Sequence, residues 1–248
     1  MKCLKLLTMK LPRRQTIRAV LFDLDDTLWP IVPVILRAEA LMHDWLSQHA
    51  PAVTERYSIA ALRARRSELI AQHPHLAIDL RALRHAGLTE AFLACDADLS
   101  KVDAAIALFS DARNQVTPYE DVAICLPRLA ERFTLGSLTN GGADLEAIGL
   151  AHHFSVSIAA HQLGRAKPDP TVFHAACDAL DLPPQQVAYV GDDLRLDVEG
   201  AQNAGLLGIW LKRDDAPVPA GCAHIQPDAS LRNLHELENW LCMNDMED

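Results

Sequence analysis

Short apolar runs recur along the chain and are separated by segments in which apolar residues have helical spacing. The runs lie at residues 17–22, 133–138, 154–159, 187–190 and 207–211. Continuous runs of this length, rich in β-forming residues, are typical of strands buried on both faces of a parallel sheet. Helical patterns occupy four further segments, residues 122–132, 168–180, 194–204 and 228–243. Strand alternating with helix predicts a doubly wound α/β fold.

Residues 33–114 break this alternation, because they carry only helical periodicity. A segment of roughly eighty residues is far too long for a plain strand-to-helix crossover. We therefore expect an inserted all-helical cap above the carboxyl ends of the strands, where α/β folds bind ligands. Residues 18–32 and 115–248 would then form the core, and residues 1–17 an N-terminal extension. One apolar stripe of the cap is predicted at Leu36, Ala40, Leu41 and Trp45.

The first strand runs directly into the acidic segment Asp23-Leu24-Asp25-Asp26-Thr27. Because side chains alternate faces in an extended segment, we expect Asp23 and Asp25 on one side and Leu24 in the core. Two carboxylates at the end of a buried strand repel each other, and a divalent cation or a shared proton would relieve the repulsion. Oxygen ligands in an open arrangement suit Mg²⁺.

A second acidic cluster follows the strand at 187–190. It consists of Gly191, Asp192 and Asp193, with Asp197 further on. Gly191 would let the chain turn sharply, and Asp192 would complete the metal site. Asp193 is a candidate helix cap, and Asp197 a candidate supporting residue behind the ligands. Because both clusters end predicted parallel strands, they indicate one shared site.

Two complementary features lie between the acidic clusters. The strand at 133–138 ends at Thr139-Asn140-Gly141-Gly142, where a hydroxyl group and flexible backbone can direct donors at a phosphoryl oxygen. Further along, Lys167 precedes Pro168, which we predict to be the first residue of a helix. Lys167 would supply the positive charge that a site of carboxylates and phosphate needs.

Taken in order, these signals resemble the motifs of the haloacid dehalogenase-like (HAD) hydrolase superfamily. The matching residues are FDLDDTLW, then Thr139, Lys167, and Gly191-Asp192-Asp193 with Asp197. The resemblance spans the sheet-forming parts of the chain and implies a Rossmann-like HAD core. The helical insertion is similar to the family's cap of the first type, which lies between the first and second motifs.

The resemblance also implies a role for each matching residue. Asp23 would attack phosphorus to give a phospho-aspartyl intermediate, and Asp25 would act first as general acid and then as general base. Thr139, Asn140 and Lys167 would bind the phosphoryl group. Asp23, the backbone carbonyl of Asp25, and Asp192 would bind Mg²⁺. A second carboxyl group that serves as acid and then as base suits such a two-step hydrolysis.

Other enzymes of the same superfamily are rival interpretations. A dehalogenase displaces halide, which needs no proton, so a carboxyl group at Asp25 followed by Thr27 favours a phosphatase. A phosphomutase on the same core is a further rival. A phospho-acceptor signalling module also sets acidic residues, a threonine and a lysine on a parallel sheet. The Asp23-x-Asp25 spacing and the large insertion argue against that module.

The expected substrate is a small phosphorylated metabolite, such as flavin mononucleotide or a sugar or nucleotide phosphate. The segment 26–29 followed by VILRAE resembles the branch that dephosphorylates flavin mononucleotide and a riboflavin precursor. Trp29 would either stack on a flat ring or pack the cap against the core. Five cap arginines would either attract an anionic substrate or form a solvated helix face. They are Arg63, Arg65, Arg66, Arg81 and Arg84.

Composition narrows the partners and the compartment. A formal net charge of -10 disfavours nucleic acid and anionic membranes as partners, and no apolar run is long enough to span a bilayer. Six scattered cysteines indicate free thiols in a reducing compartment, so we expect a cytoplasmic protein. The basic start of the chain, with Met1 or Met9 as the first translated residue, lacks the pattern of a signal peptide. The sequence does not indicate an oligomeric state.

Overall fold

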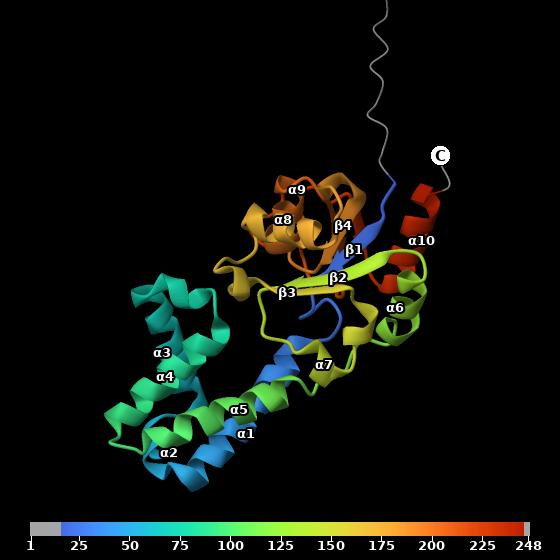
Figure 1. The fold of residues 1–248 in the computed structure, drawn as a ribbon. Coiled ribbons are helices and arrows are strands. Elements are labelled where there is room, and N and C mark those ends of the chain that lie inside the picture. Colours follow the sequence, from blue (N-terminus) through green and yellow to red (C-terminus); the bar gives the residue numbers. More distant parts are fainter. Residues whose placement is uncertain (1–15, 246–248) are drawn as a thin grey trace, which may run out of the picture.

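The computed structural model describes residues 16–245, which form an α/β core and a helical lobe (Figure 1). Six parallel strands make one sheet in the order β3-β2-β1-β4-β5-β6. Their bounds are β1 Ala19–Phe22, β2 Thr134–Thr139, β3 Val156–Ala159, β4 Val187–Gly191, β5 Leu207–Leu211 and β6 Ala229–Leu231. The chain starts in the middle and winds outward on both sides, so the predicted doubly wound sheet is confirmed.

Helices cover both faces of this sheet. Helices α6 (Val122–Ala130) and α10 (Leu234–Asp245) lie on one face, and α8 (Pro170–Ala179) and α9 (Gly200–Asn203) on the other (Figure 1). The remaining core elements are α7 Leu145–Ile148, the 3₁₀ turns η3 Ala151–His153, η4 Ala160–Leu163 and η5 Pro184–Gln186, and the π-helix η6 Leu194–Glu199. No helix within residues 16–245 is both long and apolar enough to cross a membrane.

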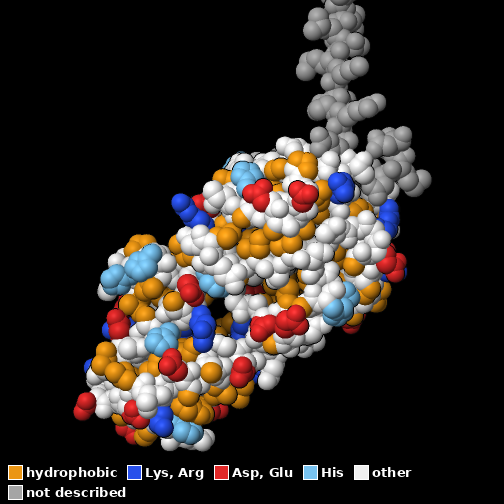
Figure 2. Space-filling view, viewed as in Figure 1, with side chains coloured by type: hydrophobic (Ala, Val, Ile, Leu, Met, Phe, Trp, Pro, Cys, Tyr) orange, Lys and Arg blue, Asp and Glu red, His pale blue; other side chains and the backbone are white. Residues whose placement is uncertain are grey.

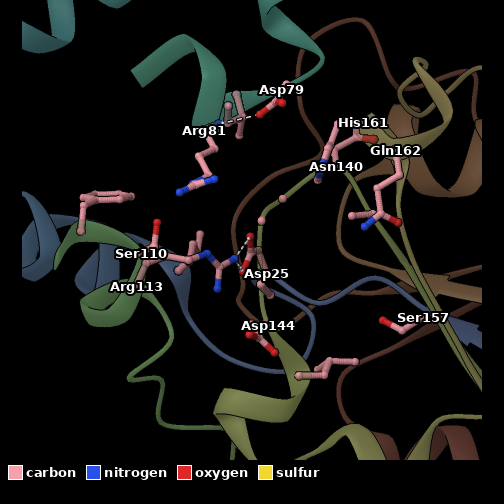
Figure 3. Close-up of a pocket in the computed structure, with 18 of the residues that line it drawn as sticks. Asp25, Asp79, Arg81, Ser110, Arg113, Asn140, Asp144, Ser157, His161 and Gln162 are labelled. Atoms are coloured by element: carbon pink, nitrogen blue, oxygen red, sulfur yellow. Dashed lines mark hydrogen bonds and ion pairs between the residues drawn. The ribbon is translucent and has the colours of Figure 1, made fainter. Parts of the chain in front are cut away.

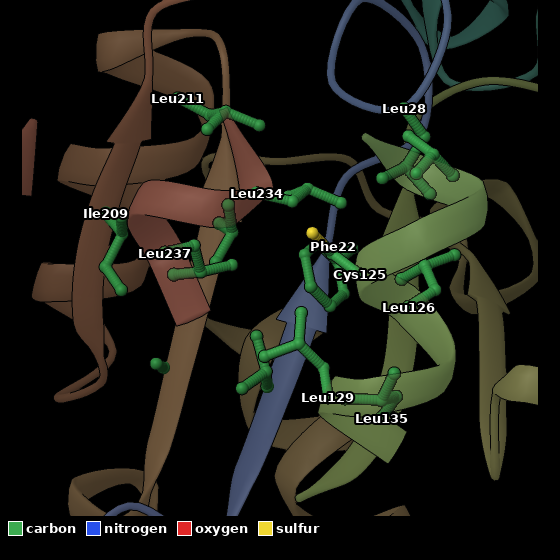
Figure 4. Close-up of a cluster of buried hydrophobic side chains, with 14 of the residues drawn as sticks. Phe22, Leu28, Cys125, Leu126, Leu129, Leu135, Ile209, Leu211, Leu234 and Leu237 are labelled. Carbon is green, nitrogen blue, oxygen red and sulfur yellow. The ribbon is translucent and has the colours of Figure 1, made fainter. Parts of the chain in front are cut away.

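The larger apolar core lies between the sheet and helices α6 and α10 (Figure 4). Phe22, Leu126 and Leu237 are among its fully buried members. Leu24 and Leu28, which lie close in sequence to Asp23 and Asp25, are also fully buried in this cluster. The burial of Leu24 agrees with the expected alternation. It also anchors the loop after β1, so that the neighbouring carboxylates face away from the core.

Three predicted helices begin or divide differently from expectation. The helix predicted at 228–243 is preceded by β6, because the Lys212 N–H donates to Leu231 O at 2.7 Å and draws this segment onto the sheet edge. The helix predicted from Pro168 begins at Pro170, where the Asp169 side chain caps it, and the Lys167–Pro168 peptide is cis. The helix predicted at 194–204 is divided into η6 and α9.

The helical lobe extends from α1 to α5 and has its own apolar core. Its elements are α1 Ile31–His49, α2 Pro51–Arg56, α3 Ile59–Gln72, η1 Pro74–Ala77, α4 Leu80–Ala94, η2 Leu99–Lys101 and α5 Val102–Arg113. The face of α1 that packs on α5 carries Val34, Ala38, Met42 and Leu46. We refer to this lobe as the cap. The predicted N-terminal extension, including both candidate start methionines, lies outside the described residues apart from positions 16 and 17.

The stripe predicted for the first cap helix is wrong. Leu36 and Leu41 are 49% and 42% exposed, whereas Val34 and Met42 are buried. Helix α1 has apolar residues on more than one face, so helical spacing alone does not identify the face that meets α5. In α3, Leu62 and Leu69 are the buried residues.

Candidate active site

Three neighbouring strands bring the predicted catalytic residues to one edge of the sheet. Asp23 follows β1, Thr139 ends β2 and Asp192 follows β4, and β1 lies between the other two. The backbone N–H of Asp23 continues the ladder by donating to Val190 O at 2.9 Å. Carboxyl ends of parallel strands are the usual ligand sites of α/β folds. The acidic residues of separate motifs therefore meet because the sheet register places them together.

Lys167 is held in place by three acceptors. Its Nζ donates to Asp23 Oδ1 at 2.6 Å, to Asp197 Oδ1 at 2.7 Å and to the Tyr189 hydroxyl at 2.8 Å. These bonds use all three ammonium protons, so the group cannot swing away without losing a partner. Burial alone would lower the pKa of Lys167, but Asp197 and Asp23 hold that pKa well above its usual value. Lys167 is therefore a fixed positive charge beside Asp23.

Asp23, Asp192 and Asp197 form a compact acidic cluster, with one carboxylate oxygen from each within 4.8 Å of the others. Burial, followed by the charges of Asp23 and Asp197, raises the pKa of Asp192 to about 8. Burial also raises the pKa of Asp23 despite the nearby Lys167. Three carboxylates and one ammonium group leave net negative charge at a largely buried site, which fits a divalent cation with oxygen ligands. The residues present thus fit Mg²⁺.

Gly191 has a different role from the sharp turn that the sequence suggested, whereas Asp193 caps a helix as predicted. Gly191 has no positive φ, so no sharp left-handed turn requires it. Instead, a Cβ atom at this position would lie 2.2 Å from Asp197 Oδ2, so the position needs glycine for the close approach of that carboxylate. Asp193 caps η6 by accepting hydrogen bonds from the backbone N–H groups of Arg195 and Leu196, both at 2.8 Å.

Asp25 lies two residues after Asp23 in the sequence, but its carboxylate is held by different partners. Arg113 Nη2 lies 2.7 Å from both oxygens of Asp25, and Trp29 Nε1 donates to Asp25 Oδ1 at 2.9 Å. A Cβ atom at Gly141 would lie 2.5 Å from Asp25 Oδ2, so the glycine of the second motif makes room for this carboxylate. Asp25 therefore lies at the junction of the first two motifs and the last cap helix.

Trp29 does not present its ring to a ligand. It is fully buried in the core cluster, and its indole N–H is bonded to Asp25. Of the two roles predicted for Trp29, the structure supports packing and not stacking on a substrate ring. The sequence could not separate the two interpretations, because a tryptophan after the catalytic strand suits either a ring contact or core packing. Burial and the indole hydrogen bond decide for packing.

Thr139 and Asn140 shape the loop after β2. The Thr139 hydroxyl accepts a hydrogen bond from the backbone N–H of Gly141 at 2.9 Å, which curls the chain back on itself. Asn140 makes two bonds with the backbone of Lys167: Oδ1 accepts from its N–H at 2.8 Å, and Nδ2 donates to its carbonyl at 3.1 Å. Asn140 also lines the cavity described below. Its side chain thus ties the second motif to the third.

Two residues of the site were not singled out from the sequence. Arg113 is the last residue of α5 and is separated from Asp25 by the whole cap. Tyr189 lies in β4, and its hydroxyl donates to Leu138 O at 2.6 Å while accepting from Lys167. A phenol inside an otherwise apolar strand is a usable signal, because a buried hydroxyl needs a partner. Nothing in the sequence points to Arg113.

A cavity of about 810 Å³ lies between the core and the cap beside Asp25. Figure 2 shows the molecule hollowed between its two parts. The core wall includes Asn140, Ser157 and His161, and the cap wall includes Arg81 and Ser110 (Figure 3). A cavity of this size accepts a small organic molecule.

Comparison with known proteins assigns the family. A family model for haloacid dehalogenase-like hydrolases matches residues 17–205, and the chain therefore belongs to the haloacid dehalogenase-like hydrolase family. Among curated proteins, the chain is 31% identical over 205 residues to the 5-amino-6-(5-phospho-D-ribitylamino)uracil phosphatase YigB of Escherichia coli. That match covers 80% of this chain and 85% of YigB.

Solved structures give the same family. A 2-haloacid dehalogenase from Pseudomonas syringae superposes with a TM-score of 0.85 and 35% identity, covering 92% of this chain and 99% of that chain. A HAD phosphatase from Thermococcus onnurineus gives a TM-score of 0.67 and 26% identity, with coverage of 91% and 98%. The chain is a hydrolase, and the names of its curated relatives support a phosphate monoester as the substrate.

Proposed function

We propose that the protein is a Mg²⁺-dependent phosphomonoesterase that works through a phospho-aspartyl intermediate on Asp23. One observation carries this proposal: Asp23 is held by Lys167 within an acidic cluster, while Asp25 is held separately at the edge of a cavity. The two carboxylates have different surroundings, as they need for different chemical roles. The curated relatives named as phosphatases support the same reaction.

In the first step, Asp23 is the nucleophile. Lys167 holds Oδ1, which leaves the other carboxylate oxygen to attack phosphorus. The bond from phosphorus to the ester oxygen breaks, and protonated Asp25 gives its proton to the departing oxygen. The products are a free alcohol and an acyl phosphate on Asp23.

In the second step, Asp25 changes role. As a carboxylate it takes a proton from water, and the water oxygen attacks the phosphorus of the acyl phosphate. The bond between phosphorus and Asp23 breaks, which releases inorganic phosphate and restores the nucleophile. Arg113 and Trp29 hold the Asp25 carboxylate for this proton transfer.

Asp23, the backbone carbonyl of Asp25, and Asp192 would hold the metal. When bound, Mg²⁺ offsets negative charge on the phosphoryl oxygens. Lys167 contributes positive charge beside Asp23, and the Thr139 hydroxyl, at the end of the neighbouring strand β2, would contact a phosphoryl oxygen. These side chains bind and orient the phosphoryl group for attack.

We further propose a small phosphorylated metabolite as the substrate and the cytoplasm as the location. The cavity volume suits such a molecule. The similarity to YigB makes 5-amino-6-(5-phospho-D-ribitylamino)uracil and flavin mononucleotide the first compounds to assay. All five cysteines in the described part of the chain are free, which fits a reducing compartment.

The test is turnover of p-nitrophenyl phosphate with and without Mg²⁺. We expect multiple turnovers with Mg²⁺, loss of activity in EDTA, and no turnover by Asp23→Asn despite an unchanged melting temperature. The Asp25→Asn variant is mixed with an activated phosphate ester and the reaction is rapidly quenched. Phosphate is then expected to remain bound to Asp23, where mass spectrometry would detect it. A single stoichiometric burst in the wild type would instead indicate a phospho-acceptor module.

A haloacid dehalogenase is the second candidate, because the similarity to the Pseudomonas syringae protein extends over 92% of this chain. Halide release from 2-chloropropionate in the presence of EDTA would support it. The presence of a carboxyl group at Asp25 argues against it, since displacement of halide needs no proton donor.

A further inference from the structure

The cavity between cap and core has two chemically different ends. Asp25 lies at the core end, and Arg81 and Arg84 of α4 line the cap wall. Ile35 and Phe109 contribute apolar surface to the same cavity. A substrate whose phosphoryl group lies at the core end would therefore place its remaining part against the cap. The chemistry of that wall determines which substituents are bound favourably.

Arg81 is a free cation at this wall. Within residues 16–245 its guanidinium makes no hydrogen bond or ion pair; only its backbone N–H is bonded, to Asp79 Oδ1 at 3.0 Å. Figure 3 shows the guanidinium pointing away from Asp79 and toward the part of the cavity where Ser110 lies. A planar guanidinium in this position offers two parallel hydrogen bonds to a carboxylate or a phosphate.

Arg84 belongs to a group of arginines that is incompletely neutralised. Glu39 of α1 is buried and accepts from Arg63 Nε at 2.6 Å, Arg66 Nη2 at 2.6 Å and Arg84 Nη1 at 3.3 Å. Three guanidinium groups share one carboxylate, which leaves excess positive charge behind the cavity wall. Burial, followed by the charge of Arg66, lowers the pKa of Arg84 to about 10. Arg63, Arg66 and Arg84 thus do not form a plain solvated helix face. The single carboxylate of Glu39 also does not neutralise all three of their charges.

Within residues 16–245, no acidic side chain of the cavity forms an ion pair with Arg81 or Arg84. Asp79 and Asp144 accept backbone N–H bonds at the starts of α4 and α7, where they cap these helices. Asp25 is paired with Arg113. Glu146 lies on α7 of the core wall. The cap end of the cavity is therefore suited to an anion that arrives with a ligand.

We propose that Arg81 and Arg84 form a subsite for a second anionic group of the substrate, either a carboxylate or a second phosphate. This inference rests on the proposed phosphatase function and predicts that compounds with an anion at each end are better substrates than 5-amino-6-(5-phospho-D-ribitylamino)uracil and flavin mononucleotide, whose ends remote from the phosphate are uncharged. An uncharged polyol or ring would leave the excess charge of the cap wall uncompensated. An anion would pair with Arg81 and lessen the mutual repulsion of Arg63, Arg66 and Arg84.

The experiment compares matched phosphate esters. For the carboxylate arm, 3-phosphoglycerate is compared with glycerol 3-phosphate; for the phosphate arm, fructose 1,6-bisphosphate is compared with fructose 6-phosphate. We expect the wild type to favour the doubly anionic member of at least one pair. In Arg81→Gln the ratio of kcat/KM within that pair is expected to fall roughly 10- to 100-fold, the range of a lost charged hydrogen bond. This ratio is insensitive to a general loss of activity.

Two further variants are compared with Arg81→Gln. Arg56→Gln removes a cap arginine outside this cavity, whose guanidinium donates to Ala94 O, and is expected to keep the wild-type ratio. Arg84→Lys keeps the charge and is expected to lower the ratio less than Arg81→Gln. Equal kcat/KM within both pairs, or a ratio that Arg81→Gln leaves unchanged, would overturn the proposed subsite while phosphatase activity remains. Absence of turnover of every ester, p-nitrophenyl phosphate included, would overturn both proposals.

Discussion

Arg113 Nη2 lies 2.7 Å from both carboxylate oxygens of Asp25, which joins the last cap helix to the loop after β1. Both side chains are largely shielded from solvent, at 7% and 22% exposure. The same guanidinium therefore holds the proposed proton-transfer group through Nη2, while its Nη1 is buried without a partner among the described residues.

Replacing Arg113 tests whether it positions Asp25. Arg113→Met is expected to lower kcat for p-nitrophenyl phosphate by roughly 10- to 100-fold, the range of a lost charged hydrogen bond. Arg113→Lys, which restores the charge with a single donor group, is expected to recover part of that loss. The matched control is Arg128→Met, because Arg128 pairs with Glu238 on the far side of the core. Wild-type kcat in Arg113→Met would show that Asp25 does not depend on this contact.

Tyr189→Phe tests the support of Lys167. The change removes one of three acceptors around a buried ammonium group and leaves Leu138 O without its donor. We expect a loss of about 1–3 kcal/mol in the free energy of unfolding, measured by urea denaturation, together with a lower kcat. Tyr57→Phe, in the cap, is the matched control and is expected to change neither quantity. An equal effect of both substitutions would contradict the assigned role of Tyr189.

Gly191→Ala tests the close approach of Asp197. The added methyl group would lie 2.2 Å from Asp197 Oδ2, so this carboxylate must move away from Lys167. We expect kcat to fall by at least about tenfold, since a 1 Å displacement of catalytic groups has large kinetic effects. Gly142→Ala adds the same methyl group where no atom lies within 4 Å, and it is expected to fold normally. Full activity of Gly191→Ala would mean that the position of Asp197 is unimportant.

We expect the stability of the metal-free protein to depend on pH, because the pKa of Asp192 is raised. Its pKa is raised from 3.8 to about 8, so the folded protein binds a proton that the unfolded chain releases above pH 3.8. The stability contributed by this group is therefore complete below about pH 4 and is lost as the pH rises toward 8. Asp192→Asn is expected to raise the unfolding free energy of the metal-free protein at pH 8 by about 2–4 kcal/mol, and by much less at pH 4.

Urea denaturation in EDTA at several pH values measures this difference. Mg²⁺ is expected to stabilise the wild type at pH 8 and to have a smaller effect on Asp192→Asn, because the variant lacks the negative charge of this ligand. Asp193→Asn is the matched control, since the Asp193 side chain caps η6 and lies outside the acidic cluster. A stability difference that does not change with pH would contradict the raised pKa of Asp192.

The sequence predicted the parallel sheet and the shared site of Asp23, Lys167 and Asp192. Asp23 and Asp192 come just after buried strands, and Lys167 directly precedes a predicted helix. Strand ends are fixed by local patterns, and parallel pairing then brings them together. The Asp25–Arg113 pair could not be predicted in this way. It depends on where α5 ends after the chain has passed through the entire cap, which no local pattern specifies.

Other differences have local physical causes. The helix predicted from Pro168 starts two residues later, because Asp169 supplies the cap and precedes Pro170 at the first helical position. The segment 229–231 joins the sheet edge, since backbone bonds to β5 outweigh its helical spacing. Trp29 is buried because its ring fills the main core and its N–H finds an acceptor in Asp25.

The groups that surround Asp23 come from the core, whereas Arg81 and Arg84 come from the cap. Apart from changes at Arg113, which holds Asp25, mutations in the cap would therefore alter which compound is accepted without disturbing the groups proposed to break the phosphate ester bond. Divergence between descendants of one ancestral enzyme can proceed in this lobe while the reaction itself is inherited unchanged.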